Sequence, residues 1–333
     1  SPAPAPNLKT MASPGPAASH IEVDPTFLED PTSETYDSSG YDTSTASLSS
    51  SIQQYVFENG RRYHAYYGVD KNPLPTDEAE QDRMDLHHEM LLKLLDGRLY
   101  LAPLKDPQRI LDVGTGTGIW AIDMADKFPA AEVIGVDLSP IQPPWVPPNC
   151  RFEVDDVEKP WTYPPDSFDF IHLRNLAQAL TDWPGVLKHA YRCLKPGGYI
   201  ELAEICAVIE CDDGSLDASN PIKQWSDRLG EAMVKIKRPP AATEQLLVDN
   251  LKKAGFTDVT VGTRTKLPIA PWPKDQKLKE VGAMNMLSTE TGYHAYGMGA
   301  FTRILGMSND EADALCTAAK RATKNKNYHG FGH

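Results

Sequence analysis

Three glycines at alternating positions are the residues of this sequence best placed to do chemistry. Gly114, Gly116 and Gly118 lie in the stretch LDVGTGTGIW, between a short hydrophobic run and an amphipathic one. Glycine allows a tight turn and a close approach of a ligand to the backbone, and the start of the following helix offers free N–H groups. In this strand–turn–helix setting the pattern predicts a nucleotide site.

The spacing of these glycines indicates which nucleotide binds. A dinucleotide loop of the form G-x-G-x-x-G would need its third glycine at position 119, where this chain has Ile119. The observed G-x-G-x-G, preceded by Asp112, is the form that holds the amino-acid end of S-adenosylmethionine. The pattern therefore favours a methyl donor, and a nicotinamide-dependent oxidoreductase on the same fold is the weaker alternative.

Acidic positions further along the chain support a nucleotide at this place. Asp137 ends the next hydrophobic run, where a carboxylate can accept hydrogen bonds from both ribose hydroxyls. The run after it ends in Asp155, Asp156 and Val157, where an acid and the flanking backbone can contact adenine. The acid at 137 would suit NAD equally well, so it indicates a ribose and not which cofactor carries it.

These positions need a sheet that brings the ends of its strands together. From residue 108 on, short β-like runs alternate with helical patterns, which predicts a mostly parallel sheet with helices on both faces. Strands are predicted at RILDVG (109–114), EVIGVDL (132–138), RFEVDD (151–156), FDFIHLR (168–174), YIELAEI (199–205) and GFTDVTVGTR (255–264). Because NKNYHGFGH follows without another aliphatic run, either the last strand was removed or the sheet is one strand short.

Composition excludes several classes of protein. The chain has 33 Lys and Arg against 46 Asp and Glu, a net charge of −13, which argues against direct nucleic-acid binding. No run approaches the ~20 apolar residues of a membrane span, and the N-terminal residues show no secretory signal. The five cysteines form no C-x-x-C pair, which predicts neither a disulfide framework nor a metal site. We expect a reducing compartment, cytoplasmic or nuclear.

Taken in order, four stretches resemble a known family. LDVGTGTGIWAIDMADKFP, VIGVDLSPIQPPWVPPNCRFEVDD, FDFIHLR and LKPGGYIELAE are similar to the fungal LaeA-like methyltransferases. The resemblance runs from residue 58 through 216, is most specific in 110–204, and thins out toward the C-terminus. It implies a class I, Rossmann-like α/β fold, S-adenosylmethionine as cofactor, and a link to fungal secondary metabolism or development. The usual aromatic-rich last strand of the family is missing here, and basic clusters that would support nuclear import are weak.

The resemblance also implies roles for individual residues. The glycine loop would hold the methionine moiety, Asp137 the ribose, and Asp156 with Val157 the adenine. Trp120 would pack beside the loop or, alternatively, under the first helix of the domain. Arg61 would pair with the cofactor carboxylate or form a structural salt bridge. The full predicted cofactor set is Tyr55, Arg61, Asp112, Gly114, Thr115, Gly116, Gly118, Trp120, Asp137, Leu138, Asp155, Asp156, Val157 and Arg174.

We predict three segments with different roles. Residues 1–46 are rich in Ser, Pro and Ala and are expected to be a disordered tail. Residues 47–105 are expected to form a helical cap, with Thr76 as a helix N-cap. Residues 106–333 are expected to form the methyltransferase domain, with helical insertions near 206–240 and 265–326.

Methyl transfer from a sulfonium requires an aligned nucleophile about 3–3.5 Å from the methyl group. A base helps when the nucleophile is a hydroxyl or an amine. The candidates are His172 at the end of a predicted strand and His64 and Tyr63 in the cap. A core histidine with a satisfied hydrogen bond is the alternative for His172, and the pair His87 and His88 is expected to be structural.

The expected function is methyl transfer to oxygen or nitrogen of a small fungal metabolite. Strand 168–174 ends in LRNL and not in the (D/N)PPY pattern of amide and exocyclic-amine methylators. The alternative is a LaeA-like regulator of secondary metabolism that acts through protein partners of the velvet type. Neither hypothesis involves a membrane.

Overall fold

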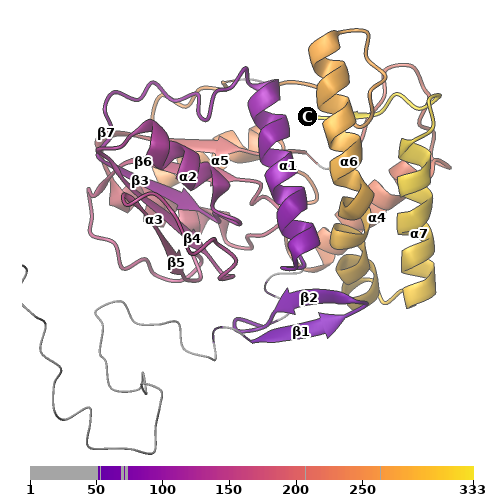
Figure 1. Cartoon of the computed structure of the whole chain (residues 1–333), viewed down its shortest axis with the longest axis horizontal. Coiled ribbons are helices and arrows are strands. Elements are labelled where there is room, and N and C mark those ends of the chain that lie inside the picture. The colour runs from indigo at the N-terminus through magenta and orange to yellow at the C-terminus, as the bar shows by residue number, and fades with distance from the viewer. Residues whose placement is uncertain (1–51, 53, 69–70, 72–73, 207, 263) are drawn as a thin grey trace, which may run out of the picture. The chain divides into compact units, whose positions relative to one another are not determined.

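A five-stranded parallel sheet forms the centre of the molecule (Figure 1). The computed structural model describes residues 52, 54–68, 71, 74–206, 208–262 and 264–333, so the predicted tail at 1–46 lies outside it. The strand order is β5-β4-β3-β6-β7, and every neighbouring pair is parallel. The bounds are β3 (Arg109–Val113), β4 (Glu132–Asp137), β5 (Cys150–Val154), β6 (Phe168–Arg174) and β7 (Leu194–Ala203). All five lie where the sequence predicted strands.

Helices cover both faces of this sheet, which is why its inner strands are almost continuously apolar. On one face α3 (Trp183–Cys193) and α5 (Glu244–Ala254) close a core that contains Leu111, Ile171 and Leu187. On the other face α2 (Ile119–Lys127) packs over a second cluster of the sheet. The predicted α/β fold with helices on both faces is confirmed.

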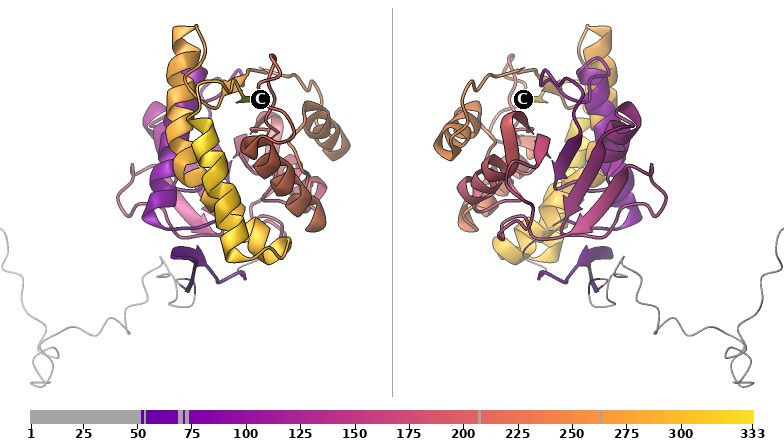
Figure 2. Two further views of the ribbon diagram at one scale, coloured as in Figure 1. Left: turned by 90° about the vertical axis from the view of Figure 1, so that its right-hand side faces the viewer. Right: turned by 90° about the vertical axis from the view of Figure 1, so that its left-hand side faces the viewer.

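A further helical layer stands beside the sheet. It consists of α4 (Pro221–Lys235), α6 (Gln276–Gly299), the π-helical turn η3 (Ala300–Ile304) and α7 (Asn309–Thr323). Helix α6 packs against α1 (Glu78–Leu94) on one side and α7 on the other, as Figures 1 and 2 show. Among the described helices, none combines the length and apolar character needed to cross a membrane.

Part of the predicted helical cap is wrong. Strands β1 (Tyr55–Glu58) and β2 (Arg61–His64) form an antiparallel hairpin where we expected helix. The turn is Asn59-Gly60, and both residues have positive φ, 49° and 72°. Asn-Gly is the pair that two-residue hairpin turns prefer, because both positions need this conformation. Helix α1 is confirmed, but its N-cap is Asp77, whose side chain accepts from the Glu80 N–H, and not Thr76.

The predicted strand at 255–264 is also wrong. In the part of this segment that the structure describes there is no strand, and β7 is the edge of the sheet. Phe256 packs edge-on to Tyr191, with ring centroids 5.2 Å apart, whereas Val261 is exposed. The chain then forms a two-stranded pair, β8 (Leu267–Pro268) with β9 (Phe331–Gly332). The boundaries at 46 and 105 stay predictions.

Candidate functional site

The glycine loop leaves the middle of the sheet at the carboxyl end of β3. This strand has β4 on one side and β6 on the other, so the loop opens into the crevice where the strand order reverses. Gly114, Gly116 and Gly118 all have positive φ, 69°, 60° and 83°. Gly118 is the N-cap of α2 and no side chain caps this helix, so its first N–H groups are available to a ligand.

The three glycines are needed for different reasons. A Cβ at Gly114 would lie 2.4 Å from Leu176 Cδ2, and one at Gly118 would lie 2.3 Å from Phe152 Cζ. At Gly116 the nearest atom would be Met84 Sδ, at 3.4 Å. Gly114 and Gly118 are therefore constrained by packing, whereas at Gly116 the positive φ of 60° is the main constraint.

Asp112 and His172 lie beneath the loop and are hydrogen-bonded to each other. Asp112 Oδ2 accepts from Thr115 Oγ1 at 2.6 Å, and its Oδ1 accepts from His172 Nδ1 at 2.8 Å. The His172 ring is stacked on Trp120, with centroids 3.7 Å apart, and its side chain is 1% exposed. Trp120 in turn donates to the Leu99 carbonyl. This geometry favours the core alternative for His172 and for Trp120, with both supporting the loop from below.

Asp137 lies where the sequence predicted it, at the end of β4. Its Oδ2 accepts from Gly116 N at 2.8 Å and its Oδ1 accepts from Ser139 N at 3.0 Å. A carboxylate has about four acceptor sites, so these two N–H groups, together with that of Leu138, leave acceptor capacity for a ligand. Ser139 Oγ is buried and has no hydrogen-bond partner in the part of the chain that the structure describes. Free acceptors beside an unpaired hydroxyl suit a ligand with neighbouring hydroxyl groups. Sequence reasoning missed Ser139, since a lone serine after a strand gives no signal.

The end of β5 is linked to the N-terminal segment. Asp156 is buried, accepts from Glu158 N at 3.0 Å, and forms an ion pair with Lys71 Nζ at 3.0 Å. Lys71 also pairs with Glu158, and its carbonyl accepts from Arg238 Nη2 at 2.9 Å. Lys71 therefore lies at this end of the site. Asp155 is exposed and caps the Asp156 N–H, while Val157 packs against the core.

Arg174 and α1 close the opposite end. Val113 pairs with Leu173, so Gly114, where the loop begins, lies next to Arg174, the last residue of β6. Arg174 Nη2 donates to His88 Nδ1 at 3.1 Å, and no carboxylate among the described residues forms an ion pair with this guanidinium.

Helix α1 supplies contacts that sequence reasoning missed. His88 Nε2 donates to Asp123 Oδ2 at 2.9 Å, and Asp85 Oδ1 accepts from Thr117 Oγ1 at 2.6 Å. Asp85 and His88 stand three residues apart and so share a helix face, which was the available signal.

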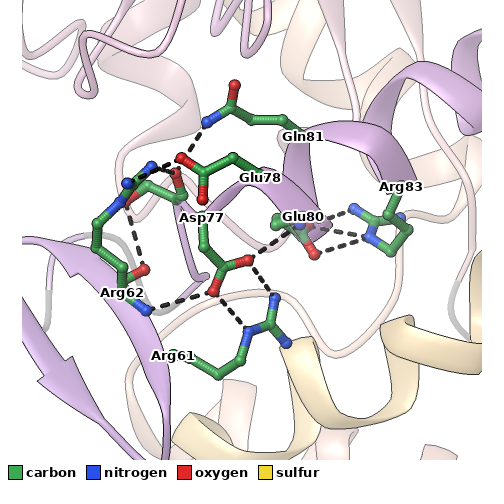
Figure 3. A network of polar contacts seen from close by, with 8 residues as sticks. Arg61, Arg62, Asp77, Glu78, Glu80, Gln81 and Arg83 are labelled. Atoms are coloured by element: carbon green, nitrogen blue, oxygen red, sulfur yellow. Dashed lines mark hydrogen bonds and ion pairs between the residues drawn. The ribbon is translucent and has the colours of Figure 1, made fainter.

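The structure places the remaining cap candidates away from the loop. Arg61 forms two hydrogen bonds with Asp77, at 2.6 and 2.8 Å, within the network of Figure 3. Tyr63 is buried under Arg303, and His64 Nε2 donates to the Ile52 carbonyl. The Tyr55 ring lies edge-on to His64 and beneath Arg62. Arg61 thus forms the structural salt bridge, and this geometry does not support Tyr63 or His64 as bases or Tyr55 as a cofactor contact.

We expect Arg61→Ala to lower the free energy of unfolding by about 1–2 kcal/mol, because it removes a half-buried bidentate pair that orients the N-cap of α1. Affinity for S-adenosylmethionine should change less than about twofold. Urea unfolding and calorimetry measure the two quantities. The matched control is Arg228→Ala, whose exposed pair with Glu231 should contribute almost nothing. A large loss of affinity for S-adenosylmethionine at an unchanged free energy of unfolding would instead indicate that Arg61 contacts the cofactor.

Comparison with known proteins decides the family. A family profile described as a methyltransferase domain matches residues 86–261. The methyltransferase pytC of Aspergillus terreus is 40% identical over 97% of this chain and 96% of its own length. The chain belongs to the methyltransferase family.

Two LaeA-type relatives are similar over less of their length. The secondary metabolism regulator laeA of Aspergillus flavus is 38% identical over 86% of this chain and 77% of that protein. The protein-methionine methyltransferase laeA of Emericella nidulans is 36% identical over 86% and 76%.

This membership confirms the predicted resemblance and the predicted enzyme class. S-adenosylmethionine is the cofactor of this methyltransferase, and the oxidoreductase alternative is dropped. The residues present fit that cofactor: the uncapped start of α2, the remaining acceptor capacity of Asp137 and the unpaired Ser139 hydroxyl match a methionine end joined to a ribose. The described residues contain no cluster of His, Cys, Asp or Glu suited to a metal ion.

Proposed function

We propose that the protein transfers the methyl group of S-adenosylmethionine to oxygen or nitrogen of a small fungal metabolite. The observation that carries this proposal is the similarity to pytC, a named methyltransferase, over nearly the whole of both chains. The regulators named laeA match over about three quarters of their length.

In this proposal the cofactor lies across the carboxyl edge of the sheet. Its amino-acid end rests on the glycine loop and the uncapped start of α2, with its carboxylate near Arg174. Asp137, with Leu138 and Ser139 beside it, holds the ribose, and Asp156 with Val157 holds the adenine. When bound, the cofactor supplies an activated methyl group. Arg174 suits the carboxylate because it ends the strand beside the loop and forms no ion pair with a described carboxylate.

The acceptor is placed at the rim where β6 and β7 end. Asn175 Nδ2 donates to His87 Nε2 at 3.0 Å. Burial lowers the pKa of His87 to about 3, helped by the charges of Arg83 and Arg174, so this imidazole stays neutral. Glu204 accepts from the N–H groups of residues 176 and 177, and burial raises its pKa to about 7. A carboxyl group that titrates near neutrality can take the proton of an acceptor hydroxyl, and we assign that role to Glu204.

Glu204→Gln should slow methyl transfer on the order of 10²-fold, because the amide cannot take a proton. Cofactor affinity should change less than about twofold. Glu201→Gln is the matched control, since Glu201 lies on β7 three residues before Glu204 and also accepts from two backbone N–H groups, those of Leu101 and Ala102. Equal rates for the two variants would remove Glu204 from the chemistry.

Cofactor affinity should also fall in acid. Burial raises the pKa of Asp137 to about 6, although hydrogen bonds from Ser139 N and Gly116 N oppose this. Only the ionised form can accept from two ribose hydroxyls. Affinity should therefore be constant above about pH 7 and weaken by up to about tenfold per unit below about pH 6. Calorimetry across this range tests it. Glu204→Gln should retain the decrease in affinity at low pH. Asp137→Asn should bind weakly at every pH, without this decrease. A wild-type affinity that does not change with pH would contradict the role of Asp137 in the ribose site.

A second candidate is methyl transfer to a protein, favoured by the Emericella nidulans relative named as a protein-methionine methyltransferase. A regulatory role with velvet-type partners belongs to this alternative. Incubation with methyl-labelled S-adenosylmethionine and a fungal extract, split into small-molecule and protein fractions, separates the two. We expect label in the small molecules, lost with Asp137→Ala. Label confined to protein would overturn the proposed acceptor.

We place the enzyme in the cytoplasm or nucleus, which its five free cysteines support.

A further inference from the structure

Arg238 is a buried arginine whose guanidinium is only partly paired. The residue is 5% exposed, and its Nη2 donates to the Lys71 carbonyl at 2.9 Å. Its Nε and Nη1 atoms are buried and have no hydrogen-bond partner in the part of the chain that the structure describes. These two atoms carry most of the N–H groups of a guanidinium. Burying a charge is costly unless it is paired and hydrogen-bonded, so Arg238 lacks the partner that its burial requires.

The end of α4 sets the position of this side chain. Lys237 has a φ of 61°, a left-handed conformation that side chains disfavour, and Arg238 N donates back to the Met233 carbonyl at 2.9 Å. A bond of this span closes a helix with a reversal of the chain. Because of this reversal Arg238 is buried, although Lys235 and Lys237 are exposed.

Arg238 lies beside the loop at 175–182, which leaves the acceptor rim where β6 ends. In the middle of this loop Gln178 Nε2 donates at 3.3 Å to the carbonyl of Pro240, two residues after Arg238. The far end of the loop is held by Glu158, whose Oε1 accepts from the N–H groups of residues 181 and 182 at 2.6 and 2.7 Å. Arg238 is therefore placed between the acceptor rim and the end of the site assigned to adenine.

Glu158 acts on Arg238 through its charge and not through a contact. Burial lowers the pKa of Arg238, and the charge of Glu158 opposes this shift. Among the described residues the Glu158 carboxylate is bonded to Lys71 Nζ and to groups of Thr181 and Asp182. The unpaired N–H groups of Arg238 are thus left for an acceptor from outside the chain.

We propose that Arg238 binds a carboxylate or phosphate group of the acceptor molecule, at a distance from the atom that is methylated. This proposal rests on the proposed function and narrows its substrate class to acidic metabolites. A guanidinium binds such an oxyanion through charge-assisted N–H···O bonds, and the oxyanion supplies the negative charge that the buried guanidinium lacks. The carboxylate of the cofactor does not fill this role, because it is assigned to Arg174 at the opposite end of the site.

The first test measures the charge of the methylated product. The full chain is incubated with methyl-labelled S-adenosylmethionine and a fungal extract, and the small-molecule fraction is applied to an anion-exchange resin at about pH 7. We expect the labelled product to be retained. Release at about pH 3 indicates a carboxylate, whose pKa is about 4, and loss of retention after phosphatase treatment indicates a phosphate ester. A labelled product that passes through the resin at pH 7 would refute the anionic acceptor and leave the proposed function standing. Absence of labelled small molecules would refute both.

The second test assigns the anion to Arg238. At a limiting concentration of the labelled acceptor, Arg238→Gln should slow its methylation on the order of 10²-fold. Arg238→Lys should recover part of this loss, because it keeps the charge without the planar fork. Affinity for S-adenosylmethionine, measured by calorimetry, should change less than about twofold. Arg228→Gln is the matched control, since it removes an exposed arginine of the same helix, and it should methylate like the wild type. Equal rates in Arg238→Gln and Arg228→Gln, or a large loss of cofactor affinity in Arg238→Gln, would contradict the proposal.

Thermal unfolding without ligand distinguishes recognition from a structural role. A structural arginine that balanced the charge of Glu158 would leave a buried charge behind when removed, which is strongly destabilising. A guanidinium that waits for a ligand has no such partner, so Arg238→Gln should lower Tm by less than about 5 °C. A larger fall would mean that Arg238 is paired within the folded chain, and the proposal would be wrong.

Discussion

Replacing Gly118 by alanine should lower the free energy of unfolding by about 2–4 kcal/mol. The added Cβ would lie 2.3 Å from Phe152 Cζ, at a φ of 83° that side chains disfavour. Overpacking in a close-packed interior costs about 1–3 kcal/mol, and the left-handed backbone adds about 1 kcal/mol or more. Phe152 is held between β4 and the loop, so it has little room to move. Urea unfolding followed by circular dichroism measures the change.

Gly197→Ala is the matched control for backbone strain alone. Its φ is 81°, nearly the same, and no atom lies within 4 Å of the added Cβ. We expect a loss of about 1 kcal/mol from this substitution. If both variants lost the same free energy, close packing under the loop would not be the reason for glycine at 118.

Asp137→Ala should weaken binding of S-adenosylmethionine on the order of 10²-fold or more. It removes a carboxylate proposed to accept two ribose hydrogen bonds, each contributing about 1.5–3 kcal/mol when charged. It also removes the acceptor that holds Gly116 N, so the loop loses support. Calorimetric titration measures the affinity.

The control for Asp137→Ala is Asp126→Ala, which removes an exposed carboxylate from α2. This variant should keep the wild-type affinity within about twofold. A similar loss in both variants would indicate a general charge effect, and wild-type affinity in Asp137→Ala would remove this residue from the ribose site.

The features that the sequence predicted well are those written in local pattern. The five strands, helix α1 and the glycine loop each follow from periodicity and from residue types within about ten positions. The hairpin at 55–64 is equally local, because Asn59-Gly60 signals its turn, but the expectation of a helical cap at 47–105 did not use that signal. In the segment at 255–264 apolar and polar residues alternate as they do in a strand. A strand also needs a neighbouring strand to pair with, and the sequence of the segment does not reveal whether one is present.

Assignments that depend on distant partners could not be predicted. Arg61 is held by Asp77 and His172 by Asp112, 16 and 60 residues away. Nothing in the local sequence of either residue reveals these partners. The hydrogen bonds from Arg174 to His88 and from His88 to Asp123 join β6, α1 and α2. They therefore form only when α1 packs against the sheet domain. The sequence predicted residues whose place is set by a local turn, such as the glycine loop. It did not predict the roles of residues that are set by partners far away in the sequence.

Calorimetric titration of the chain with S-adenosylmethionine, S-adenosylhomocysteine and NADH tests the central claim most directly. The loop with Ile119 in place of a third glycine, the free acceptors of Asp137 and the family membership predict binding of the first two and none of NADH. Binding of NADH, or of none of the three, would contradict the account of this crevice as an S-adenosylmethionine site.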